Sequence, residues 1–259
     1  MLIAVASVKG APGVTTLALG LAALWPELGA VLVECDPDGG DLAARFGHHP
    51  DPGLASLAAA ARTGLTQVPL AEHVQRLAVG ANVVLAPPGD GAAAAVQTLT
   101  YSGGETLRRA GDDQPVVVDL GRLSRGGPGL ALAAVADHVL VVAGAQLADA
   151  TQVQARLEWL RPELSGRLWL VRAGDGGYSS TELARDLGVP VLWDLPHSRL
   201  GAGALTGQLR VPNWRRLKLA RAVRGMATTL TTAQPASILP EFDPARQLAV
   251  RPVVEGRHR

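Results

Sequence analysis

Cysteine and lysine are both scarce in this sequence. The 259 residues include one cysteine, Cys35, which excludes an internal disulfide and favours a reducing, cytoplasmic location. Lysine occurs twice, at Lys9 and Lys218, while arginine supplies the remaining basic charge. Because arginine supplies nearly all the basic charge of this chain, the presence of a lysine at position 9 favours a functional explanation for that residue.

Long apolar runs are absent as well. No stretch reaches the roughly 18 apolar residues that a membrane span requires. The first residues read as the start of a strand, without the basic region of a signal peptide. The net charge of +1 excludes no class of partner, and the hydrophobic content of 47% suits an α/β protein with a large core.

Short runs of Val, Leu and Ile alternate with helical stretches rich in Ala, Leu and Arg. Buried parallel strands have this appearance, and the intervening lengths suit crossover helices. The pattern predicts a doubly wound, mainly parallel sheet with helices on both faces and a ligand at the carboxyl ends of the strands. The predicted strands are 2–8, 30–35, 82–86, 115–120, 138–143, 167–172 and 190–194.

We expect one domain over residues 1–230. From Thr231 onward the sequence contains four prolines and loses helical periodicity, which indicates a partly ordered C-terminal tail over residues 231–259.

The most informative segment is residues 7–16, which read Ser-Val-Lys-Gly-Ala-Pro-Gly-Val-Thr-Thr. It lies between a predicted strand and a predicted helix, so backbone N–H groups and the helix N-terminus would converge on an anion. The usual phosphate-binding loop is G-x-x-x-x-G-K-[ST], whose lysine contacts the β- and γ-phosphates. Val14 replaces that lysine and removes a contact worth roughly 1.5–3 kcal/mol. Pro12 removes one N–H donor. The alternative is a strand–turn–helix corner without a ligand.

This loop resembles the K-G-G-x-G-K-[ST]-[ST] motif of the MinD/ParA family of deviant Walker A P-loop ATPases, of the SIMIBI class. Residues 34–40 (Glu-Cys-Asp-Pro-Asp-Gly-Gly) are similar to the family's D-x-D-P-Q-G segment, and residues 116–121 to its Walker B strand. Residues 136–142 and 187–196 are similar to two later family segments. The likeness covers roughly residues 1–230 and implies a P-loop NTPase-like fold that binds ATP and Mg²⁺.

The resemblance also implies roles for individual residues. Thr15, Glu34 and Asp119 would serve the metal, the last two indirectly. Asp36 would position or activate water, and Lys9 would reach the partner's nucleotide in a homodimer, so these two would be catalytic. The nucleotide would be bound by Lys9, Gly10, Ala11, Pro12, Gly13, Val14, Thr15, Thr16 and Pro196.

Simpler interpretations exist for the acidic residues and for Arg172. Asp36, together with two later aspartates, could serve as a turn or helix-cap residue, and Asp119 could cap the next loop. Arg172 stands where relatives often carry a base-reading Asn, and it could pair with a phosphate or be a solvated loop residue.

Basic side chains gather between Arg210 and Arg224, where six Lys or Arg residues occur without an acidic one. Apolar residues recur there and beyond at helical spacing, which predicts an amphipathic basic helix over 210–224. Such a face could bind DNA non-specifically or meet another acidic partner. The simpler interpretation is a solvated face on the last packing helix of the fold.

Three functions fit these observations. The first is a nucleotide-operated, dimerising switch with slow or absent hydrolysis that positions a cargo in chromosome or plasmid partitioning, septum placement, or pilus or secretion machinery. The second is a pseudo-ATPase localisation scaffold similar to TadZ/CpaE that no longer binds nucleotide. The third is a small-molecule enzyme similar to the related synthetases, for which the chain offers few additional polar residues near the loop.

Overall fold

The computed structural model describes residues 1–10, 13–26, 29–63, 68–102, 104–164 and 166–232. In this part of the chain one sheet of eight strands has the order β3-β4-β2-β5-β1-β6-β7-β8, and only β3 is antiparallel to its neighbour. The strands are β1 (Leu2–Ser7), β2 (Val31–Glu34), β3 (Gln75–Arg76), β4 (Asn82–Val84), β5 (Val116–Arg122), β6 (His138–Gly144), β7 (Leu168–Ala173) and β8 (Val191–Leu195).

The apolar runs predict seven of these strands to within two residues at each end. The predicted fold class, a doubly wound and mainly parallel sheet, is therefore confirmed. The strand that sequence reasoning missed is β3, whose two residues, Gln75 and Arg76, are too few and too polar to form an apolar run.

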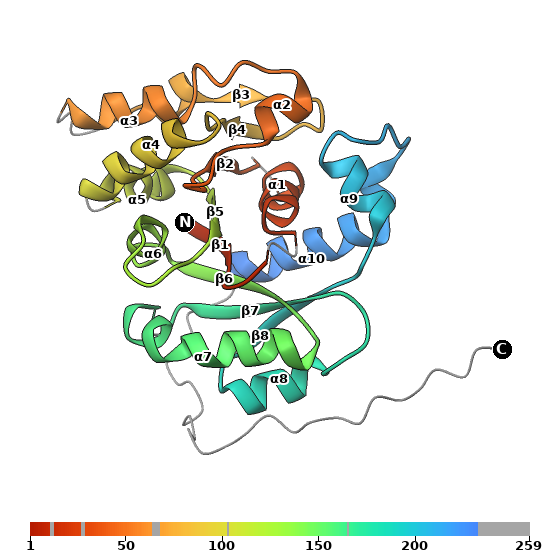
Figure 1. Ribbon diagram of the computed structural model, residues 1–259. Coiled ribbons are helices and arrows are strands. Elements are labelled where there is room, and N and C mark those ends of the chain that lie inside the picture. The colour runs from red at the N-terminus through yellow and green to blue at the C-terminus, as the bar shows by residue number, and fades with distance from the viewer. Residues whose placement is uncertain (11–12, 27–28, 64–67, 103, 165, 233–259) are drawn as a thin grey trace.

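Helices cover both faces of the sheet (Figure 1). Along β1, Leu2 and Ala4 pack into one apolar layer, while Ile3 and Val5 pack into the other. The layer of Ile3 contains α1 (Val14–Leu24), α2 (Leu42–Phe46), α9 (Arg199–Leu205) and α10 (Lys218–Thr232). The opposite layer contains α3 (Leu54–Arg62), α4 (Asp90–Tyr101), α5 (Glu105–Asp113), α6 (Pro128–Ala133), α7 (Leu147–Leu164) and α8 (Ser180–Leu187), and the 3₁₀ turns are Leu70–His73 and Trp214–Arg216.

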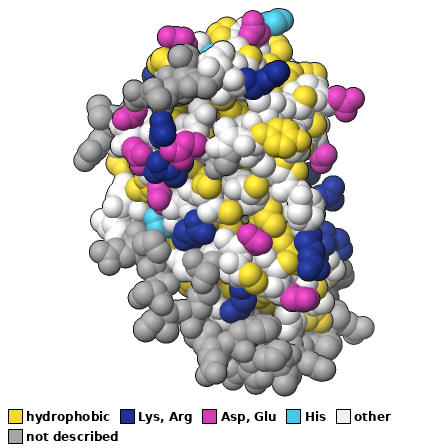
Figure 2. Space-filling model, turned by 90° about the vertical axis from the view of Figure 1, so that its left-hand side faces the viewer, with side chains coloured by type: hydrophobic (Ala, Val, Ile, Leu, Met, Phe, Trp, Pro, Cys, Tyr) yellow, Lys and Arg dark blue, Asp and Glu magenta, His cyan; other side chains and the backbone are white. Residues whose placement is uncertain are grey.

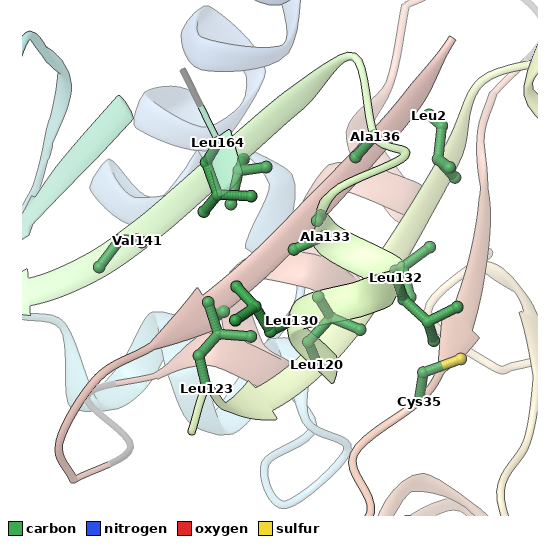
Figure 3. Close-up of a cluster of buried hydrophobic side chains, with 14 of the residues drawn as sticks. Leu2, Cys35, Leu120, Leu123, Leu130, Leu132, Ala133, Ala136, Val141 and Leu164 are labelled. Carbon is green, nitrogen blue, oxygen red and sulfur yellow. The ribbon is translucent and has the colours of Figure 1, made fainter. Parts of the chain in front are cut away.

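Figure 3 shows part of the layer beneath α6. Leu130 of that helix lies close to Leu120 of β5 and to Leu123, and these three residues belong with Leu132 to one buried cluster. Cys35 lies at the edge of the same cluster as a free, buried thiol, and burial raises its pKa. The single cysteine therefore acts as a small apolar core residue here.

The basic segment is only partly helical, so the predicted helix over 210–224 is wrong in its first part. Pro212 has no backbone N–H, and Asn213 adopts a left-handed conformation with φ of 54°. A 3₁₀ turn follows, and α10 begins only at Lys218. Beyond that point the predicted spacing holds, because the apolar face of α10 is buried: Leu219, Val223, Met226 and Leu230.

The predicted tail, residues 231–259, lies outside the described residues except for its first two, which complete α10. The division into a domain over 1–230 and a tail therefore stays a prediction. None of the helices that the structure describes is both long and apolar enough to cross a bilayer. On the face shown in Figure 2, acidic and basic side chains are scattered among apolar and uncharged ones.

Candidate nucleotide site

The predicted phosphate loop lies at the carboxyl end of β1, between that strand and α1. Gly13, with φ of 94°, is the N-cap of α1 and offers no side chain to cap it. The first N–H groups of a helix lack partners within the helix, so this uncapped end can receive an anion. Gly10 also has positive φ, at 64°, and is exposed. Ala11 and Pro12 lie outside the described residues.

Val14 stands at the first position of α1 and is buried, with 2% of its surface exposed. It belongs to the apolar layer that includes Ile3, Leu17 and Val223, and it also borders a cavity beside the loop. Where a phosphate-binding lysine would place an ammonium group, this chain therefore places an aliphatic side chain that packs on the sheet.

That cavity, of about 340 Å³, is strongly acidic. We call it the acidic cavity, and it lies between the start of α1, the end of β2 and the start of α2. Five of its lining residues carry carboxylates and one, Arg45, carries a positive charge. The lining residues are Gly13, Val14, Thr15, Thr16, Glu34, Asp36, Asp38, Gly39, Asp41, Arg45 and Asp119.

Glu34, the last residue of β2, holds two neighbouring segments in place. Its Oε1 accepts hydrogen bonds from the backbone N–H groups of Asp41 and Leu42, each at 3.2 Å, and its Oε2 accepts one from Ala86 at 2.9 Å. Burial raises its pKa to about 7, although these N–H donors favour the charged form. Sequence reasoning missed this anchoring role, because the partners are 7, 8 and 52 residues away in the chain.

Asp119 lies beside Glu34, its register partner across the β2–β5 pair, and is also buried. Burial raises its pKa to about 6, while interactions with the Thr15 side chain and the Gly121 N–H, 3.0 Å from Oδ1, oppose the rise. The structure thus brings Thr15 and Asp119 together from opposite parts of the sequence. A hydroxyl and a carboxylate are hard oxygen donors, the kind that Mg²⁺ prefers.

Asp36 follows β2 and is half-buried in the same acidic cavity. Its Oδ1 accepts the backbone N–H of Asp38 at 2.9 Å, which forms the turn that the simpler interpretation proposes. Burial raises its pKa. Gly121, with φ of 57°, lets the carboxylate approach so closely that any side chain at position 121 would collide with it.

Lys9 is exposed and is not among the residues that line the acidic cavity. Its side chain makes no hydrogen bond or ion pair with the other residues that the structure describes. The positive charge of Lys9 therefore lies at the surface of the chain.

A second cavity, of about 380 Å³, lies on the other side of the loop, and we call it the apolar cavity. It shares Gly13 and Thr16 with the acidic cavity, so the two adjoin at the start of α1. Pro196, a predicted nucleotide contact, is part of its wall. The lining residues are Gly13, Thr16, Leu17, Ala173, Gly174, Leu195, Pro196, His197, Ser198, Arg199, Ala202, Leu219 and Val223.

Arg172 takes neither role considered from the sequence. Its guanidinium contacts the carbonyls of Tyr178 and Gly176, each at 2.7 Å, and Asp194 at 3.1 Å, so it organises the loop after β7. Only 14% of its side chain is exposed.

Within the described residues, no group of three or more His, Cys, Asp or Glu side chains is arranged to hold a metal ion by itself. Mg²⁺ usually keeps several waters and is bound by one or two protein oxygens together with substrate phosphates. The oxygen donors at Thr15 and Asp119 fit such a site.

The fold is similar to that of several solved structures. A ParA family ATPase from Chlorobium tepidum TLS aligns with a TM-score of 0.70 and 17% identity, over 88% of this chain and 98% of that one. MinD from Pyrococcus horikoshii OT3, complexed with Mg-ADP, aligns with a TM-score of 0.67 and 15% identity, over 92% and 99%. The D38A variant of McdA from Cyanothece, in complex with ATP, aligns with a TM-score of 0.65 and 18% identity, over 90% and 97%. The sequence matches no family model and no curated protein.

Proposed function

We propose that this chain binds a magnesium–adenine nucleotide across the two adjoining cavities and hydrolyses it slowly or not at all. One observation carries the proposal: an apolar cavity and an oxygen-lined cavity meet at Gly13 and Thr16, where the uncapped N-terminus of α1 begins. A base needs apolar walls, and phosphates need N–H donors, so a nucleotide fits the pair better than it fits either cavity.

Residues from different elements would contact different parts of the nucleotide. The apolar cavity, with Leu195 and Pro196 in its wall, would hold the base and ribose. Backbone N–H groups at the start of α1 would hold the phosphates, and Thr15 with Asp119 would hold the Mg²⁺, which neutralises phosphate charge. Asp36 would orient a water beside the terminal phosphate. Without a lysine at position 14, stabilisation of developing charge is weak, so we expect at most a weak ATPase.

In this proposal the nucleotide controls a homodimer that positions a cargo. The exposure of Lys9 supports the dimer, because a lysine outside its own cavity can serve a partner's nucleotide. The cargo is a chromosome or plasmid, a septum, or pilus or secretion machinery, and the similarity to MinD, a septum site-determining protein, supports the septum. A cytoplasmic location is part of the proposal.

The basic segment would supply contacts to an acidic partner such as DNA. All six of its cations are exposed, and none forms a salt bridge with a described residue. They are Arg210, Arg215, Arg216, Lys218, Arg221 and Arg224. The buried apolar face of α10 favours the alternative of a packing helix whose basic face is only solvated.

A specific observation also favours a scaffold that binds no nucleotide. The acidic cavity has five carboxylates against one arginine, and Val14 is part of the core. Phosphates would meet repulsion there unless a cation accompanies them. The scaffold would keep the fold and the dimer surface while leaving the cavities without a ligand.

The experiment is calorimetric titration of Mg·ATP, together with sedimentation velocity with and without it. Thr15→Ala should weaken Mg·ATP binding by about tenfold, because the hydroxyl contacts the metal. Thr151→Ala is the matched control, because that exposed hydroxyl only contacts the carbonyl of Leu147 within α7. Equal binding by both variants would contradict the proposed site, and no binding by the unchanged protein would favour the scaffold.

A further inference from the structure

The acidic cavity contains one positive charge that the sequence motifs do not assign. Among the described residues that line it, Arg45 is the only basic one, and it comes from α2 rather than from the phosphate loop. It lines this cavity of about 340 Å³ together with Thr15, Asp36 and Asp119. A guanidinium in the wall of this cavity can supply a positive charge in place of the ammonium group that Val14 removes.

The backbone that carries Arg45 is firmly held. Leu42, in the first turn of α2, is fully buried. The buried carboxylate of Glu34 accepts the N–H groups of Asp41 and Leu42, so the start of the helix is tied to the end of β2. The Cα of Arg45 therefore stands at a fixed position relative to the cavity.

Its side chain is held much less firmly. Within the described residues, Nη2 is the only side-chain atom of Arg45 that makes a hydrogen bond, which it donates to Oδ2 of Asp41 at 2.7 Å. The side chains of this pair are 32% and 68% exposed, and exposed pairs of this kind contribute little stability. The other N–H groups of the guanidinium are available to a ligand.

Arg45 also lines a neighbouring groove of about 480 Å³, together with Phe46, Trp214 and Arg210. Its side chain therefore forms part of the wall between two open spaces. Rotation about side-chain bonds can aim the guanidinium into either space without moving the backbone. A phosphate in the acidic cavity would be a stronger partner than the exposed carboxylate of Asp41, because arginine can bind phosphate through two parallel hydrogen bonds.

We propose that Arg45 binds the terminal phosphate of the nucleotide and replaces the missing Walker A lysine. This inference rests on the proposed nucleotide function. In the absence of nucleotide the guanidinium pairs with Asp41, and when nucleotide is bound it exchanges that carboxylate for phosphate oxygens. The site then distinguishes ligands by their phosphates, since Arg45 lines the acidic cavity but not the apolar one.

The test is calorimetric titration of Mg·ATP, Mg·ADP and adenosine into the unchanged protein and five variants. Arg45→Ala should weaken Mg·ATP binding by about tenfold or more and leave adenosine unchanged, and Arg45→Lys should recover part of the loss. Val14→Lys combined with Arg45→Ala should restore Mg·ATP binding. Arg108→Ala is the matched control, because Arg108 also pairs with an aspartate four residues along a helix but lies on α5; it should bind as the unchanged protein does.

Asp41→Ala separates a ligand role from a structural one. If Arg45 binds phosphate, removal of its competing carboxylate should leave Mg·ATP binding unchanged or make it tighter. If Arg45 acts only through the ion pair with Asp41, both alanine variants should weaken binding alike, and the inference is overturned. It is also overturned if Arg45→Ala binds Mg·ATP as the unchanged protein does, while the proposed function stands. No binding of any nucleotide by the unchanged protein would overturn both.

Discussion

The two cavities beside α1 have similar volumes and opposite chemistry. The apolar cavity, about 380 Å³, is lined mainly by aliphatic side chains and backbone, whereas the acidic cavity, about 340 Å³, is lined by five carboxylates and Arg45. An apolar pocket binds mainly through shape, but a phosphate pocket depends on charge. The first can therefore work in this chain by itself, while the second needs Mg²⁺ and a cation from elsewhere in the molecule.

Filling the apolar cavity should have the largest effect, because it should weaken the binding of both ligands rather than of one. Ala202→Phe places a ring against its wall, so the binding of Mg·ATP and of adenosine should both fall by about tenfold or more. Calorimetry with both ligands measures this effect. Ala131→Phe, at an exposed position of α6, is the control and should change neither affinity. Retained adenosine binding in Ala202→Phe would remove the apolar cavity from the site.

Restoring the missing charge should affect the acidic cavity alone. Val14→Lys should tighten Mg·ATP binding by about 10- to 100-fold, because a charge-assisted hydrogen bond contributes roughly 1.5–3 kcal/mol. Adenosine, which has no phosphate, should bind as before. Since Val14 is buried, denaturation in urea should accompany the titration to verify folding. An equal gain for both ligands would contradict the division between the cavities.

The buried carboxylates should make stability depend on pH. Burial raises the pKa of Glu34 to about 7 and that of Asp119 to about 6, above the unfolded values near 4.5 and 3.8. Groups whose pKa is raised by folding bind more protons in the folded state, so the free energy of unfolding should fall as the pH rises from about 4 to 7.

Asp119→Asn should reduce that fall by an amount on the order of 1–3 kcal/mol, because the amide has no charge to bury. Urea denaturation without Mg²⁺ at several pH values would measure it. The exposed Asp112 supplies the control, Asp112→Asn, whose pH profile should match that of the unchanged protein. If the pH profile of Asp119→Asn also matches that of the unchanged protein, folding does not raise the pKa of Asp119.

Lys9 should have the smallest effect on a single chain. Because it is exposed and lines neither cavity, Lys9→Ala should change Mg·ATP affinity in dilute protein by less than about twofold. Dimer formation with Mg·ATP, measured by sedimentation velocity, should nevertheless be lost. A large loss of affinity at low protein concentration would place Lys9 in its own site and contradict the role across a dimer.

Sequence reasoning predicts those features that depend on local pattern. The strands follow from apolar runs. The proximity of Thr15 and Asp119 agrees with the metal roles that the family resemblance implies for them, which the apolar runs alone do not predict. Arg45 could not be assigned a role, since its spacing from Asp41 indicates only a helical ion pair. The anchoring by Glu34 and the loop organised by Arg172 depend on hydrogen bonds to backbone groups, which leave no pattern in the sequence.

The most direct test of the account is the magnesium dependence of nucleotide binding by the unchanged protein. ADP and adenosine are each titrated into the protein, once in the presence of Mg²⁺ and once in the presence of EDTA. The account predicts that Mg·ADP binds. Chelation of Mg²⁺ should weaken ADP binding by about tenfold or more, because five carboxylates then face the phosphates without a metal ion. The affinity for adenosine should be the same with and without Mg²⁺. ADP binding that is equally strong in EDTA, or no binding of any of these ligands, would contradict it.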